Sequence, residues 1–273
     1  MVMTLSEQMQ VTNPDWLAFL QHLRYRQVEL KDIEMLRRLV LTNKEAIHTD
    51  FTSEIWQKAA LIVTPWHTVR QLWNETALMK HGKATHQMIL ECEADDTIRK
   101  QPLTLAEKHA RYIREKSLDS RQRKQELPQS MQIVLGMKVM VTQNVVTDLD
   151  ITNGARGTIV DVWLHPEEPA ITELKPSIKL KHLPVCILVE LDRTRTSQLT
   201  GLEERVIPVE PASHTYRISC QGSEGNIITR TVRRRQFPMT PAYAFTDYRS
   251  QGQTLAAVIV DLATPPTGKL LIL

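Results

Sequence analysis

The sequence lacks several features that would place a protein in a narrow class. Only three of its 273 residues are cysteines, Cys92, Cys186 and Cys220, and they lie far apart. This odd number and spacing give neither a disulfide framework nor a zinc motif, so a reducing compartment is expected. No apolar run approaches the ~20 residues that span a bilayer, and the N-terminus has no signal-peptide pattern. We therefore expect a soluble intracellular protein with no membrane contact.

Sequence motifs for catalysis are also missing. A phosphate-binding P-loop has the form G-x-x-x-x-G-K-[ST], and the nearest match, Gly82-Lys83-Ala84, lacks both the first glycine and the final hydroxyl residue. The nine histidines are scattered at spacings that predict no metal site. Two predicted strands end in an acid, Glu91 and Asp261. Acids at such positions can hold magnesium, but without a P-loop nearby a solvated strand end is the simpler interpretation. No catalytic residue is therefore predicted.

Positive charge is gathered in two segments, although the formal net charge is only +3. From Arg99 to Lys124 there are nine Lys or Arg against three Asp or Glu, and from Ile228 to Arg249 five Arg against one Asp. Clustered positive charge suits a polyanion such as nucleic acid. A solvated helix face explains the first segment equally well.

The first half of the chain predicts helices and an α/β unit. The segment 13–40 is expected to form helices, with Asn13 or Asp15 as the first cap, and with an apolar core face made of Trp16, Leu20, Leu23, Ile33, Leu36 and Val40. Ala60–Val63 then predicts a short buried strand, followed by a helix through Leu78. Such β-loop-α units are typical of parallel sheets, which bind ligands at the carboxyl ends of their strands. Further along, Gln87–Glu91 predicts a strand and Leu105–Ser117 a charged helix.

The second half predicts a β-rich region inside that α/β fold. Short strands separated by turn residues follow Leu127-Pro128, and Asn153-Gly154 is a strong hairpin signal. This pattern indicates a small β-barrel or SH3-like module. The strands near Ala244 and at Ala257–Leu262 again have the character of buried parallel strands. An insertion into one wound sheet explains this order better than two successive domains.

Polar residues follow two of the predicted parallel strands. The first group comprises Val63–His67 with Arg70 and Asn74, and the second is Thr246–Thr254. Within the second, Gly252 permits close backbone approach, and an arginine can fork onto phosphate. A plain strand-to-helix connection, capped by a hydroxyl side chain, is the alternative.

The second group carries a family resemblance. Ala242–Thr254, read as A-x-A-x-T-x-x-x-S-Q-G-x-T, resembles motif V of superfamily-one DNA helicases, in the Pif-type and RecD-type branch that includes fungal Helitron helicases. Gly136–Asn144 followed by Asn153–Val160 is similar to the signature that opens the SH3-like insert of that branch. Val63–Pro65 with Asn74 is similar to motif IV, and the segment 13–24 resembles the helical linker before the second motor domain.

The resemblance implies a fold and a division of the chain. It implies a helical linker over residues 1–56, a RecA-like parallel sheet over 57–130 and 228–273, and an SH3-like β-barrel insert over 131–227. The family binds ATP and Mg²⁺ between two motor domains, of which the first carries the P-loop. Because this chain resembles only the second domain, without the arginine-finger motif, we expect an incomplete C-terminal half that hydrolyses no ATP alone. A truncated or fragmentary gene product is the simplest account.

The resemblance also implies site residues and partners. Nucleotide contacts are expected from Arg249, Gln251, Gly252 and Arg70, and DNA contacts from Thr246, Ser250 and Thr254. The expected partners are single-stranded or forked DNA and a separate P-loop motor domain, in the nucleus or in mitochondria. DNA repair, recombination, telomere maintenance and transposition all fit the family.

This sequence departs from the family pattern at Trp66, where the family usually has Arg or a polar residue, and at Tyr248 and Arg249, which replace His and Lys. A non-enzymatic nucleic-acid-binding module and a transposon remnant are the alternatives.

Overall fold

The computed structural model describes residues 11–117, 126–144, 152–171, 175–194, 197–221, 226–246, 250 and 255–262. The chain divides into two compact units. The first unit holds residues 1–60, 255–257 and 262–273, and the second unit holds residues 61–254 and 258–261. The protein is a mixed α/β structure with a parallel sheet and several further sheets. None of the described helices combines the length and the apolar character needed to cross a membrane.

The first unit contains three helices among its described residues. Its helices are α1 (Pro14–Tyr25), α2 (Leu30–Arg37) and α3 (Glu54–Ala59). The Asn13 side chain accepts a hydrogen bond of 2.9 Å from the backbone N–H of Trp16, which confirms the predicted cap of α1. The start of α2 is closed by Asp32, which accepts from the backbone N–H of Glu29 at 2.8 Å. In the first turns of α1 and α2, a polar side chain thus satisfies a free backbone donor.

The predicted apolar core of these helices was partly wrong. Phe19 is buried, but three residues expected in the core are 38% to 46% exposed: Leu23, Ile33 and Val40. Helical periodicity identifies an apolar face, but it does not show whether the chain supplies a surface to cover that face.

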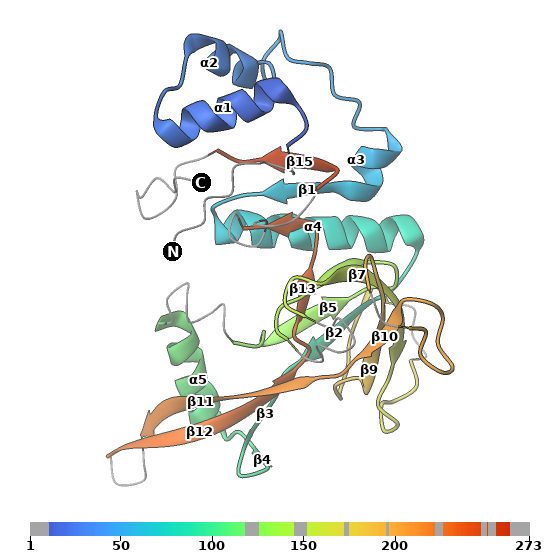
Figure 1. Cartoon of the computed structure of the whole chain (residues 1–273). Helices are drawn as coiled ribbons and strands as arrows, with labels where there is room; N and C mark the ends of the chain where they lie inside the picture. Colours follow the sequence, from blue (N-terminus) through green and yellow to red (C-terminus); the bar gives the residue numbers. More distant parts are fainter. Residues whose placement is uncertain are drawn as a thin grey trace, which may run out of the picture. The chain divides into compact units, whose positions relative to one another are not determined.

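The parallel sheet of the second unit has the strand order β14-β1-β15 (Figure 1). Its strands are β1 (Ala60–Val63), β14 (Ala244–Phe245) and β15 (Ala257–Val260). The helix α4 (His67–Thr85) follows β1 and packs against β14. The predicted strand at Ala60–Val63 and the helix after it are therefore confirmed. Because β1 lies between two strands from the far end of the sequence, the β-rich region is inserted within this sheet, as predicted.

The other described strands of the second unit form three sheets. A five-stranded sheet has the order β10 (Val206–Val209), β9 (Cys186–Leu191), β7 (Arg156–Trp163), β6 (Lys138–Val141), β13 (Met239–Pro241). A four-stranded sheet has the order β11 (Ala212–Gln221), β12 (Ile227–Gln236), β3 (Asp95–Ile98), β4 (Gln101–Pro102). A three-stranded sheet has the order β5 (Ser130–Ile133), β2 (Ile89–Glu93), β8 (Ser177–Lys179).

The strand predicted at Gln87–Glu91 exists, but its partners differ from those expected. It is β2, and it pairs with β5 and β8 rather than with the parallel sheet. The β-rich region thus already begins at Ile89 and continues through β13, which pairs with β6. An isolated run of β-forming residues predicts a strand but not its neighbours, because pairing is decided by distant segments.

The largest core of the second unit fills the five-stranded and three-stranded sheets. Its fully buried members include Ile133, Met137, Ile159, Ile187, Val189, Val209 and Phe237. The return strand predicted after Asn153-Gly154 is confirmed as β7, which is antiparallel to β6, and these two residues form a turn in which the Ala155 N–H donates to the Thr152 oxygen at 3.0 Å. A two-residue hairpin is not formed, because the connection covers residues 142–155 and lies partly outside the described residues. Gly157 is required by packing, because a Cβ there would lie 2.3 Å from the backbone oxygen of Glu190 on β9. The glycine-rich signature of this segment therefore has a steric cause.

The helix α5 (Leu105–Ser117) coincides with its predicted range and lies across the hairpin of β11 and β12 (Figure 1). Leu103, Ala110, Tyr216, Ile218 and Val232 form the small core between them. Part of its positive charge is not free for a partner, because Arg111 pairs with Asp96 on β3 and Arg114 with Glu126. The positive charge found between Arg99 and Lys124 is thus partly neutralised by acidic residues within the fold.

Candidate functional site

The carboxyl ends of the parallel strands bring together the two polar groups singled out in the sequence. Val63 lies opposite Phe245 in the β1–β14 register, so Thr64 and Thr246 follow adjacent strands. The backbone N–H of Thr64 donates to the Phe245 oxygen at 3.0 Å. On the other side of β1, the backbone N–H of Asp261 donates to the Val63 oxygen at 2.8 Å. One edge of the sheet therefore carries polar residues from segments almost 200 positions apart.

Thr64 links β1 to β15 at this edge. Its hydroxyl donates to the Asp261 carboxylate at 2.7 Å and accepts from the backbone N–H of Trp66 at 3.2 Å. The Thr64 side chain is fully buried, so its hydroxyl is shielded from water, while both of its partners are partly exposed. Asp261, interpreted from the sequence as a solvated strand end, is instead bound by Thr64. Position 66 supplies a backbone donor here, whatever its side chain.

Asn74 of α4 holds β14 in place. Its side-chain oxygen accepts from the backbone N–H groups of Tyr243 and Ala244, at 3.1 and 2.9 Å. Its side-chain nitrogen donates to the Ala244 oxygen at 3.2 Å. The amide thereby satisfies backbone groups of a strand that is only two residues long, immediately before Thr246. The resemblance to motif IV singled out Asn74 in the sequence, whereas its role in positioning β14 is apparent only in the structure.

Thr246 has the least satisfied polar group at this edge. It is 3% exposed, and its hydroxyl has no hydrogen-bond partner among the described residues. Its backbone oxygen accepts from the Ser250 N–H at 3.2 Å, as in a helical turn. The remaining residues predicted here lie outside the described part of the chain: Arg249, Gln251, Gly252 and Thr254.

The buried polar residues are concentrated at this edge. In the described part of the chain, six polar or charged residues are buried, and three of them are Thr64, Asn74 and Thr246. Buried polar groups lower stability unless they are hydrogen-bonded, so such a concentration marks either a structural junction or a binding site.

Arg70 lies one turn before Asn74 on α4, where the structure places it against a cavity. The cavity has a volume of about 270 Å³ and lies between α4 and the strands β2, β5 and β13. Asn74, Glu75, Glu91 and Thr240 also line it. The half-buried Arg70 therefore lines a polar cavity in the second unit. It follows the strand-end residue Thr64 by six positions in the sequence.

A second polar group was missed by the sequence analysis. The histidines had been interpreted as scattered, but the fold brings His165, Glu167 and His182 together. The close spacing of His165 and Glu167 was a weak signal for this arrangement, whereas the third member depends on the packing of two loops.

Comparison with solved structures identifies the fold. The chain is similar to a Pif1 helicase from Candida albicans, with a TM-score of 0.57 and 21% identity over 92% of this chain and 48% of that one. It is also similar to Bacteroides Pif1 bound to ssDNA (TM-score 0.55, 17% identity, 92% and 43% of the two chains). A third similar structure is a Bacteroides Pif1 in complex with ADP-AlF3 and ssDNA. Its TM-score is 0.54, with 18% identity over 95% of this chain and 45% of that one.

These similarities show that the chain has the fold of part of a Pif1 helicase, and that it spans about half the length of those proteins. No protein-family model matches the sequence. No curated protein matches it either.

Proposed function

We propose that this chain is the second motor half of a Pif1-type DNA helicase, which binds single-stranded DNA and completes an ATP site with a P-loop domain. The observation that carries this is the parallel sheet whose strand ends join Thr64, Thr246 and Asp261 within a fold shared with Pif1 helicases. Ligands of open parallel sheets bind at such edges. ATP and Mg²⁺ would occupy the gap between this edge and the P-loop domain.

The roles of individual residues are part of the proposal. Thr246 is assigned to the DNA backbone, because its hydroxyl lacks a partner among the described residues. Because Thr246 is buried, DNA can contact its hydroxyl only if the residues covering this edge of the sheet move aside. Substitution of Thr246 therefore tests the assignment directly. Ser250 and Thr254 are assigned to DNA, and Arg70, Arg249, Gln251 and Gly252 to the nucleotide.

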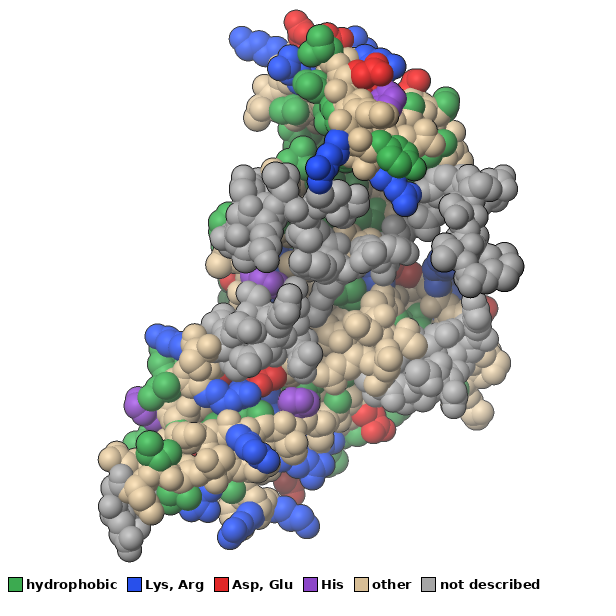
Figure 2. Space-filling model, turned by 60° about the vertical axis from the view of Figure 1, so that its left-hand side comes forward, with side chains coloured by type: hydrophobic (Ala, Val, Ile, Leu, Met, Phe, Trp, Pro, Cys, Tyr) green, Lys and Arg blue, Asp and Glu red, His purple; other side chains and the backbone are tan. Residues whose placement is uncertain are grey.

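The β11–β12 hairpin supports a role in binding nucleic acid. Its residues alternate, so that Tyr216, Ile218, Val232 and Arg234 face inward, and the outward positions are polar apart from the exposed Ile227 at the start of β12. The outward positions include Arg217, Arg233 and Arg235 and no acidic residue, although Asp95 on β3 lies opposite Arg235 in register. Figure 2 shows Lys and Arg side chains over this part of the second unit. Such a face suits a phosphate backbone.

The finer parts of the proposal concern the regions around the sheet. We assign the five-stranded sheet to an SH3-like insert that shapes the path of the strand, and α1 and α2 to a linker between motor domains. A Helitron-like origin, a nuclear location and a part in repair, recombination or telomere maintenance fit the resemblance described above. Exposed apolar residues such as Leu72 on α4 are expected of a half-motor whose partner domain covers them.

The proposal is tested by binding of the purified chain to fluorescently labelled oligo-dT at about 50 and 200 mM salt, with and without Mg·ATP. We expect salt-sensitive binding that ATP does not change and no ATP hydrolysis. Each phosphate contact contributes about 0.7 to the slope of log affinity against log salt. Changing Arg217, Arg233 and Arg235 to Gln should therefore lower the slope by about 2.

A matched control removes the same charge from the first unit, at the exposed residues Arg24, Arg37 and Arg38. If this control lowers the slope equally, the hairpin has no specific role. If the wild-type chain binds no strand at about 50 mM salt, the assignment to a DNA-binding motor half is wrong.

A non-enzymatic nucleic-acid-binding module is the second candidate, and the cationic hairpin favours it. The two candidates differ when a P-loop motor domain from a Pif1 helicase is added in trans. ATP hydrolysis that requires both proteins, is stimulated by single-stranded DNA and loses this stimulation in Thr246→Val supports the motor half. Unchanged binding without hydrolysis supports the module.

A further inference from the structure

We propose that His165, Glu167 and His182 form a binding site for a divalent transition-metal ion, zinc being the best fit, that joins two loops of the β-rich region. The site is separate from the strand-end edge and does not depend on the proposed helicase function. His165 and Glu167 lie in the connection between β7 and β8, and His182 lies between β8 and β9. One ligand atom from each residue lies within 4.8 Å of the other two.

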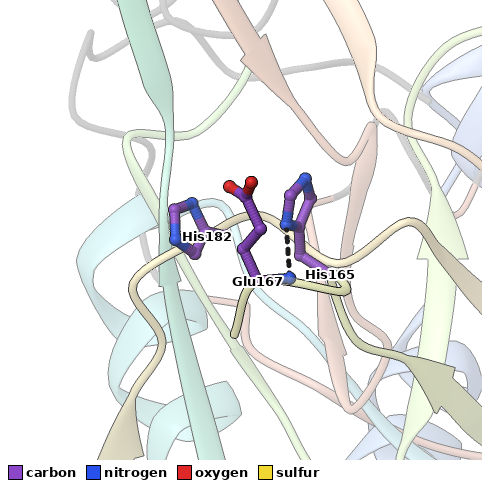
Figure 3. A group of neighbouring side chains, drawn as sticks. All are labelled: His165, Glu167 and His182. Carbon is purple, nitrogen blue, oxygen red and sulfur yellow. Dashed lines mark hydrogen bonds between the residues drawn. The ribbon is translucent and has the colours of Figure 1, made fainter. Parts of the chain in front are cut away.

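The three side chains have the chemistry and the arrangement of a metal site. The two imidazole rings are stacked with centroids 4.9 Å apart, and the carboxylate of Glu167 lies beside both (Figure 3). Two imidazoles and one carboxylate are a ligand set that zinc uses with a water molecule in the fourth position. Ligand atoms at about 2.0–2.2 Å from zinc lie roughly 3.3 Å apart. Small rotations of the exposed Glu167 and of the half-buried histidines would bring the ligand atoms from their present separations to those of a zinc site.

The two loops are already held together, which limits the entropy lost on binding. The carboxylate of Glu168 accepts from the backbone N–H groups of Lys181 and His182, at 2.9 and 2.8 Å. The Glu168 N–H in turn donates to the His165 oxygen at 2.9 Å. Leu183, next to His182, is buried in the main core. The ligand-bearing backbone is therefore fixed independently of any ion, as a preorganised site requires.

One existing hydrogen bond must be exchanged for the metal. The backbone N–H of Glu167 donates to Nδ1 of His165 at 3.2 Å. If Nδ1 binds the ion, the Glu167 N–H loses its acceptor. If Nε2 binds it, the ring proton moves to Nδ1 and the same hydrogen bond is lost. The Glu167 amide thus reports on occupancy of the site by either nitrogen.

The test is calorimetric titration of metal-free full chain with Zn²⁺ alone, repeated for His182→Ala, Glu167→Gln and His109→Ala. His109 is an exposed histidine on α5, and its variant is the matched control for adventitious binding. We expect one ion per chain for the wild type and for the control. Loss of a ligand should weaken binding by at least about 100-fold in the other two, since even outer partners of a metal site contribute 10- to 100-fold.

Two further readouts keep the test decisive. Thermal unfolding of the wild type should shift upward with Zn²⁺, and the shift should vanish in His182→Ala, which also shows whether that variant folds. In amide NMR spectra, Zn²⁺ should move the Glu167 signal and leave that of the His109 amide unchanged. Equal affinity of the wild type and His182→Ala, or an unmoved Glu167 signal at saturation, would overturn the proposal.

Discussion

Replacing Arg234 by methionine should destabilise the second unit more than any other single change to an arginine of the hairpin. Arg234 is 3% exposed and lies on the inward face of β12. Its Nε and Nη2 fork onto the two carboxylate oxygens of Asp96, at 2.8 and 2.9 Å. Nη2 also donates to Glu115 at 2.8 Å, and Nη1 donates to the backbone oxygen of Leu127 at 3.2 Å. A single side chain thus ties β12 to β3, α5 and the segment before β5.

The size of the effect follows from what the change leaves behind. The Asp96 side chain is 4% exposed, so without Arg234 its remaining ionic partner among the described residues is Arg111. Removing one member of a buried ion pair typically lowers the free energy of unfolding by about 3–5 kcal/mol, because the remaining charge is left without compensation. Arg233→Met is the control, since Arg233 is exposed and its substitution should change stability by no more than about 0.5 kcal/mol.

The measurement is urea-induced unfolding followed by circular dichroism, with Asp96→Leu and the double variant Asp96→Leu/Arg234→Met completing a thermodynamic cycle. The double variant should be less destabilised than the sum of the single variants, because it removes both charges together. If Arg234→Met lies within about 1 kcal/mol of the wild type, the ion pair does not hold the hairpin in the way the geometry indicates.

Three further predictions follow from buried groups. Asn74→Ala should lower the free energy of unfolding by about 1–3 kcal/mol and speed hydrogen exchange at the Ala244 amide, since backbone groups lose their partner; unchanged exchange would refute the positioning role. Burial raises the pKa of Asp96, but hydrogen bonds from its arginine partners outweigh it and hold that pKa below its usual value. Its contribution to stability is therefore present above the unfolded pKa of about 3.9 and is lost as the pH falls below it. Unfolding measured from pH 6 to 3 should show a smaller decline in Asp96→Asn. Burial raises the pKa of Cys92 to about 12, so a thiol reagent at neutral pH should label the half-buried Cys220 first, as read by mass spectrometry; faster labelling of Cys92 would contradict the packing.

The elements that the sequence predicted well are those decided by local residues. Ala60–Val63 and Leu105–Ser117 have their predicted bounds, and Asn13 caps α1 as expected. Asn153-Gly154 forms the local turn that its residue types favour, although the connection between β6 and β7 is longer than a two-residue hairpin loop. These signals are strong because propensity, capping and turn chemistry act within a few positions.

The features that the sequence did not predict depend on contacts between distant segments of the chain. The partner of Glu115 on α5 is Arg234, which lies 119 residues further along the chain and could not be identified from the sequence. The outward exposure of Leu23 and Ile33 could not be inferred from helical periodicity alone. Of the candidate site, the sequence located both strand ends, whereas the hydrogen bond between Thr64 and Asp261 required the fold.

The insertion within the parallel sheet has a consequence for the timing of synthesis. The hydrogen-bonded partners Thr64 and Asp261 are 197 residues apart, and a ribosome adding about 5–20 residues per second separates their emergence by roughly 10 to 40 s. For most of that interval, until β14 has been made, β1 has no neighbouring strand, while the segments from β2 to β13 can already pair among themselves. The nascent chain therefore exposes an unpaired apolar strand for much of its translation, which is the kind of segment that chaperones shield.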